Sequence, residues 1–182
     1  TSNWKTYKNN QFEFMYPQEL LLQEEGSQVS LNHFIDYKHG NLCDFKGDGT
    51  IPALDKLTDF DVSFKVFNQG LEETLQSAGS SDYIVKNFFE NDTLKLSQGF
   101  IDIFNVGSLK GFQITSGVEG CGQFTYYFPI SANKTLFVRR AFVTEFSPVI
   151  GDYQMYLNLP GIINPSQELE FFTKILSSFK IY

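Results

Sequence analysis

The chain has 182 residues with 14 Lys+Arg and 21 Asp+Glu, a formal net charge of −7. This acidic balance argues against binding to duplex nucleic acid, because such proteins neutralise phosphates with clustered cations. Hydrophobic residues make up 42% and aromatic residues 16% of the chain, enough for a large core, so global disorder is excluded. The length predicts one domain over residues 1–182, and no apolar run is long enough to predict a membrane span.

The first half of the chain alternates apolar and polar residues at period two, the pattern of half-buried strands. Residues 4–7 and 12–16 flank a polar turn and predict a hairpin. Residues 29–31 predict the next strand. The clearest alternation runs over residues 60–67, where one face carries only apolar side chains: Phe60, Val62, Phe64 and Val66.

The period changes after Gly70. Leu71 and Leu75 lie four residues apart, with Glu72 and Glu73 in the first turn, and predict a short helix that ends at Gly79. Further strands are predicted over residues 83–85, 93–96, 111–115, 123–128 and 136–142, the last two forming a second hairpin.

The end of the chain predicts a longer helix. Asn164 can cap it, and Pro165 suits the first helical position. Its apolar side chains recur at helical spacing: Leu169, Phe172, Leu176 and Phe179, flanked by Phe171 and Ile175. Together these elements predict an α+β fold, with a mostly antiparallel sheet and the C-terminal helix packed on it.

Both ends of the chain resemble a known group of domains. Residues 4–9 (WKTYKN) and 12–17 (FEFMYP) resemble the start of many small bacterial secreted or lipoprotein domains, and residues 171–180 resemble their closing helix. The pattern is similar to the PsbP-like fold, which an extrinsic photosystem II protein, a Ran-binding nuclear import factor and mycobacterial lipoproteins share. The resemblance implies one PsbP-like domain, an α/β/α sandwich with helices flanking the sheet. It supplies no family active site.

Cys43 and Cys121 both lie in polar, glycine-rich stretches. They could form a disulfide, bind a metal, include a catalytic thiolate or remain buried free thiols. We favour the disulfide, because such loops are unusual places for inert core thiols. A bridge over that separation would stabilise the fold by roughly 4 kcal/mol in the loop-entropy model, and it predicts a location outside the reducing cytosol.

The sequence offers ligands for two kinds of metal site, zinc and calcium. His33, His39, Cys43 and Asp44 lie within twelve residues and offer zinc ligands, but the usual paired spacings are absent. The alternative places His33 on a strand and His39 in a solvated loop. Hard oxygen ligands for calcium gather in one segment, although the twelve-residue calcium-loop pattern is missing: Asp44, Asp48, Asp55, Asp59 and Asp61.

A thiol mechanism is the main enzymatic alternative. Cys121 stands between Gly120 and Gly122 on a tight turn and could act as a nucleophile, with His33 or His39 as its base. No family signature surrounds this cysteine.

The aromatic and basic residues allow simpler interpretations. Tyr126, Tyr127 and Phe128 should point to both faces of a strand and join the core, although the excess of rings leaves room for a binding surface. Arg139 and Arg140 are expected to form a solvated strand pair. Residues 91–93 and 133–135 fit the N-glycosylation pattern, which matters only in a secretory host.

The sequence therefore predicts a non-enzymatic, extracytoplasmic binding or accessory domain associated with a cell envelope, through an anchor or leader before Thr1. It predicts a Cys43–Cys121 disulfide and no cofactor. The partner would be an unidentified protein or small molecule. The alternatives are a small thiol-dependent hydrolase using Cys121 and a calcium-stabilised domain around residues 44–61.

Overall fold

The computed structural model describes residues 3–43, 52–78, 89–90, 93–118 and 120–182. The strand predicted over residues 83–85 lies outside this part of the chain, as do Asp44, Asp48 and the first two residues of the 91–93 glycosylation pattern.

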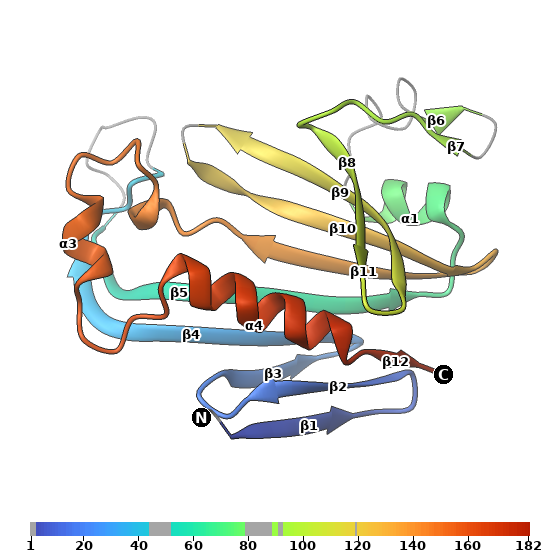
Figure 1. Ribbon diagram of the computed structural model, residues 1–182, viewed down its shortest axis with the longest axis horizontal. Coiled ribbons are helices and arrows are strands. Elements are labelled where there is room, and N and C mark those ends of the chain that lie inside the picture. The colour runs from blue at the N-terminus through green and yellow to red at the C-terminus, as the bar shows by residue number, and fades with distance from the viewer. Residues whose placement is uncertain (1–2, 44–51, 79–88, 91–92, 119) are drawn as a thin grey trace.

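A seven-stranded antiparallel sheet forms most of the structure (Figure 1). In spatial order its strands are β3 (Leu21–Glu25), β4 (Gln28–His39), β5 (Leu54–Phe67), β11 (Lys134–Ala141), β10 (Cys121–Ser131), β9 (Leu109–Val118) and β8 (Ile101–Val106). A three-stranded sheet has the order β1 (Trp4–Lys8), β2 (Phe12–Pro17) and β12 (Lys180–Ile181). A two-residue pair, β6 (Phe89–Glu90) and β7 (Thr93–Leu94), completes the described strands.

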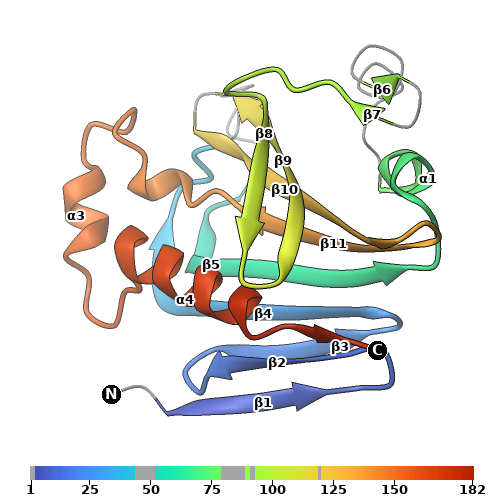
Figure 2. The same ribbon diagram turned by 45° about the vertical axis from the view of Figure 1, so that its right-hand side comes forward.

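The helices are short except for the last. They are α1 (Leu71–Ser77), the 3-10 turn η1 (Thr144–Phe146), α3 (Tyr153–Leu157) and α4 (Pro165–Ser177). Figure 1 and Figure 2 show α4 lying across one face of the large sheet, between β8 and β2. Within the part of the chain that the structure describes, no helix has the length and apolar character needed to cross a membrane.

The core has two sides because side chains in a strand alternate between the faces of the sheet. Tyr126 and Phe128 of β10 pack with α4 and β2, whereas Tyr127 packs on the other face with Leu75 of α1. The prediction that this segment points its rings to both faces is confirmed.

The predicted PsbP-like α/β/α sandwich is wrong. On one face, α4 shares the core with the small sheet, whose Tyr7, Phe12 and Phe14 are buried beside it. On the other face, α1 has only seven residues and is about 10 Å long, too short to cover a seven-stranded sheet. The fold is mostly antiparallel sheet with one long helix, and it is not flanked by two helical layers.

Several predicted elements are confirmed, and others were missed. The N-terminal hairpin, the short helix after Gly70 (α1) and the capped C-terminal helix all form. The strand over residues 29–31 extends to twelve residues in β4. Strands β3 and β8 were not predicted from the sequence. The prediction that Leu169 belongs to the buried face of α4 is wrong, because its side chain is 48% exposed.

Candidate functional site

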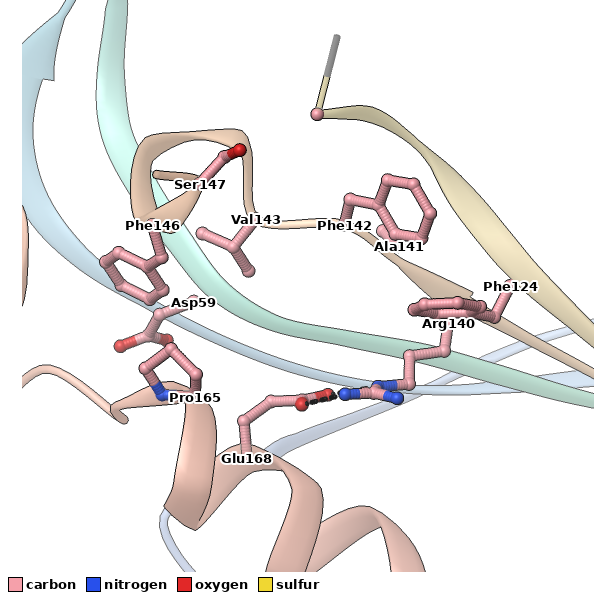
Figure 3. Close-up of a pocket in the computed structure, with 11 residues that line it drawn as sticks. Asp59, Phe124, Arg140, Ala141, Phe142, Val143, Phe146, Ser147, Pro165 and Glu168 are labelled. Carbon is pink, nitrogen blue, oxygen red and sulfur yellow. Dashed lines mark hydrogen bonds and ion pairs between the residues drawn. The ribbon is translucent and has the colours of Figure 1, made fainter. Parts of the chain in front are cut away.

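A pocket of about 290 Å³ opens where α4 begins; we call it the α4 pocket. Most of its wall is apolar, and Figure 3 shows the labelled side chains arranged around an open centre, with Phe146 across from Arg140. The apolar lining residues are Phe124, Ala141, Phe142, Val143, Phe146 and Pro165. The others are Asp59, Gly120, Arg140, Ser147 and Glu168.

An ion pair closes one side of the α4 pocket. Arg140 of β11 donates from Nε to Oε1 of Glu168 on α4 at 2.7 Å, and its Nη2 donates to Oε2 of the same carboxylate. Both side chains are largely buried, at 16% and 9% exposed. Because the pair is bidentate and shielded from water, it fixes α4 to β11 with a defined geometry.

Two aromatic rings lie close to the guanidinium of Arg140. Cζ of Arg140 lies 5.3 Å from the ring centroid of Phe124 and 5.0 Å from that of Phe172, distances suited to cation–π contact. Burial by itself lowers the pKa of Arg140, but the hydrogen bonds and charge of Glu168, with the Tyr126 hydroxyl, raise it overall. Burial raises the pKa of Tyr126. Arg140 is therefore a permanently charged, internally neutralised group.

The prediction that Arg139 and Arg140 are a solvated pair is wrong. Arg139 donates from Nη2 to both carboxylate oxygens of Asp61 at 3.0 Å, and Arg140 binds Glu168. Neighbouring residues of a strand point to opposite faces. Arg139 meets Asp61 of β5, the neighbouring strand of the same sheet, whereas Arg140 meets Glu168 of α4, which packs on the other face.

Asp59 forms part of the pocket wall because of a β-bulge. In the β4–β5 ladder, His33 pairs with Phe60 and Phe34 pairs with Thr58, which leaves Asp59 as the extra residue. The bulge turns consecutive side chains, Asp59 and Phe60, into the interior, where both are 0% exposed. Oδ2 of Asp59 accepts from the Ile163 amide at 2.7 Å, and Oδ1 lies 2.6 Å from Nδ1 of His33.

The predicted disulfide supports the rim of the α4 pocket. Cys43 and Cys121 are bonded across 78 residues. Thr144 of η1 donates from Oγ1 to the Gly120 carbonyl at 3.0 Å, and the same oxygen lies 3.2 Å from Sγ of Cys43 and 3.5 Å from Sγ of Cys121. The bridge, the turn at Gly120 and the η1 wall are therefore one connected unit.

Gly120 itself is needed at this rim. Its φ is +81°, and an added Cβ would stand 2.8 Å from Oγ of Ser147. A larger residue would combine backbone strain with a clash at the pocket edge.

His39 ties the end of β4 to the same wall. Its Nδ1 lies 3.0 Å from Oε1 of Glu145 and 2.9 Å from the Gly40 carbonyl, and its Nε2 lies 3.1 Å from the Lys56 carbonyl. The prediction that His39 lies in a solvated loop is wrong, because this residue is at the end of β4 and only 7% exposed. His33 does lie on a strand, β4, as the simpler interpretation predicted.

The structure does not bring together the proposed zinc ligands. His33 contacts Asp59, His39 contacts Glu145, and Cys43 is in the disulfide. Across the described ranges, no group of three or more His, Cys, Asp or Glu side chains could hold a metal ion. Of the calcium candidates in these ranges, Asp55 is exposed, Asp59 binds an amide, and Asp61 binds Arg139.

The proposed catalytic thiolate has no free sulfur in this structure, because Cys121 is bonded to Cys43. The two candidate bases lie against carboxylates, His33 against Asp59 and His39 against Glu145. A thiol mechanism would require the bridge to be reduced first.

Sequence reasoning missed Phe142, Phe146 and Glu168 as site residues. One signal pointed to Glu168: it lies in the first turn of a capped helix, near the expected sheet. Phe142 and Phe146 follow the last strand in an irregular stretch, where no period marks an inward side chain.

No family model and no curated protein matches this sequence. A crystal structure from Bacteroides thetaiotaomicron VPI-5482 is similar with a TM-score of 0.42 and 8% identity, over 94% of this chain and 45% of that one. This chain therefore spans less than half the length of that protein. A likeness of this extent assigns no fold family or function.

Proposed function

We propose that the chain is a non-enzymatic binding domain that works outside the reducing cytosol, and that the α4 pocket is its ligand site. The observation that carries the proposal is a concave, mostly apolar pocket built by five separate elements, whose charged side chains already have partners within the protein. Pockets with apolar walls and a few placed polar groups are the usual form of small-molecule sites.

The state of the polar groups favours binding over catalysis. A general acid or base must be able to exchange a proton with the substrate. Here both oxygens of Glu168 accept hydrogen bonds from Arg140, and Asp59 is enclosed with contacts at both oxygens. The sulfur of Cys121 is in a disulfide. Because these groups are already hydrogen-bonded or disulfide-bonded, they support a site that binds a ligand without reacting with it.

The disulfide supports an extracytoplasmic location, because such bonds persist mainly in oxidising compartments. Association with a cell envelope and an accessory role remain part of the proposal. Thiol counting tests the compartment argument: the purified protein, denatured without reductant, should show no free thiol. Two reactive thiols would remove that argument.

A fragment screen by NMR tests the ligand site. We expect small apolar fragments to shift the amide signals of residues 140–147 and 166–168. Ala141→Leu places three more carbons in the α4 pocket and should abolish these shifts. The matched control is Ala132→Leu, at an exposed position in the β10–β11 turn. Shifts that survive Ala141→Leu, or that are lost equally in Ala132→Leu, would contradict the proposal.

A further inference from the structure

We infer that the α4 pocket selects an uncharged molecule with one or two fused rings and discriminates against anions and cations of the same shape. The inference rests on the proposed function, because it names the ligand class of the same site. The observation behind it is that the charged side chains of the wall already have partners within the protein before any ligand enters.

The positively charged side chain of the wall, Arg140, is already paired with a carboxylate. Arg140 is paired in a bidentate manner with Glu168 and lies within cation–π distance of Phe124 and Phe172. An anionic ligand would have to displace Glu168 to reach this guanidinium. It would then lie beside the displaced carboxylate against a mostly apolar wall, where like charges repel more strongly than in bulk water.

The negative charges are occupied as well. Asp59 accepts from the Ile163 amide and contacts His33, and it is fully enclosed. A cationic ligand could approach only the faces of the remaining rings, next to the charge of Arg140. Burying an ion without a free partner of opposite charge is unfavourable, because the ion loses its hydration and gains no compensating interaction. An uncharged ligand avoids both penalties.

Size and wall chemistry point to a ring system. The volume of about 290 Å³ exceeds the roughly 150 Å³ of a cavity that holds one benzene. Phe124 and Phe142 meet edge to face with centroids 4.6 Å apart, and Phe146 lies on another part of the wall. A flat ring that enters between this pair and Phe146 can make edge-to-face contacts of the same kind. The hydroxyl of Ser147 at the rim can meet one neutral polar substituent.

Three naphthalenes of matched shape provide the test at pH 7: naphthalene-2-methanol, 2-naphthoate and 2-naphthylmethylammonium. We expect the neutral alcohol to bind at least about tenfold more tightly than either ion by NMR titration. An ion that binds as tightly as the alcohol would overturn the selectivity while leaving the pocket as a binding site. If none of the three shifts the lining residues, both this inference and the proposed ligand site are wrong.

A charge-switch variant separates neutralisation from simple hydrophobicity. Glu168→Gln keeps the size of the side chain and leaves Arg140 without its counter-charge. The affinity of 2-naphthoate relative to the alcohol should then rise by about tenfold. Glu13→Gln is the control, because Glu13 lies on β2 and does not line the pocket, and its ratio should equal that of the wild type. An unchanged ratio in folded Glu168→Gln would overturn the inference. If that variant does not fold, the three wild-type affinities still decide it.

Discussion

The two ends of α4 both meet clusters of aromatic rings, yet one cluster is closed and the other is hollow. Where α4 ends, four rings form a cluster in which the centroids of contacting rings are 4.9 to 6.0 Å apart, and none is more than 4% exposed: Phe12, Phe14, Phe64 and Phe179. Where α4 begins, the rings of Phe124, Phe142 and Phe146 line the α4 pocket.

The difference comes from what surrounds the rings. At the closed end, β2 and β12 are regular strands, so their side chains reach the core at fixed intervals. At the hollow end, Arg140 and Glu168 stand among the rings, and the wall from Phe142 to Ser147 is irregular apart from η1. A buried ion pair keeps its own geometry, and rings cannot collapse onto it without breaking it. An abundance of aromatic residues is therefore not itself a sign of binding.

The largest effect should come from the closed end. Phe14→Ala removes a ring that is 1% exposed and should lower the free energy of unfolding by about 3–5 kcal/mol. Phe142→Ala removes a half-buried ring at the hollow end and should cost only about 1 kcal/mol. Urea unfolding followed by circular dichroism measures both. Equal losses would mean that the two clusters are packed alike.

Removing the disulfide should act mainly on the hollow end. Replacing both Cys43 and Cys121 with Ala should cost about 2–4 kcal/mol in unfolding free energy, since the bridge restrains a 78-residue separation. Thr144 contacts both sulfurs, so naphthalene-2-methanol should also bind more weakly. Reductant should reproduce the loss in the wild type and do nothing to the double variant. Unchanged binding after reduction would show that the bridge does not hold the wall.

Losing the cap of α4 should have a smaller effect, also at the hollow end. Oδ1 of Asn164 accepts from the Gln167 amide at 3.0 Å, and Asn164→Ala should cost about 1 kcal/mol. Asn158→Ala is the control, because that exposed side chain caps no helix start. Thermal unfolding compares the two. An equal shift in melting temperature would mean that the cap contributes nothing special.

The smallest effect should be a pH dependence of stability that comes from Glu13, beside the closed end. Hydrogen bonds from Lys180 and Tyr182 lower the pKa of Glu13 from 4.5 to about 2. A lowered carboxyl pKa contributes stability that is present above pH 4.5 and is lost as the pH falls through 2. Wild-type melting temperature should therefore fall more steeply than that of Glu13→Gln between pH 4.5 and 2. Parallel curves for the two proteins would contradict this contribution.

Much of the secondary structure could be predicted, because local patterns encode it. The alternation at Phe60, Val62, Phe64 and Val66 does mark the buried face of β5. β3 was missed because residues 23–25 are polar, and an edge strand with exposed side chains carries no alternation. The site was harder to predict. The bulge at Asp59 changes which side chains face inward, and its cause lies in the pairing with β4.

The sequence by itself determined the strands with clear alternation, the capped last helix and the possibility of a disulfide between two cysteines. Those properties depend on neighbouring residues or on residue type. Only the tertiary structure decided that Arg140 meets Glu168, that Asp59 turns inward, and that a pocket stays open beside them. Each of these depends on contacts between residues far apart in the chain, where a change of one position in register moves a side chain to the opposite face.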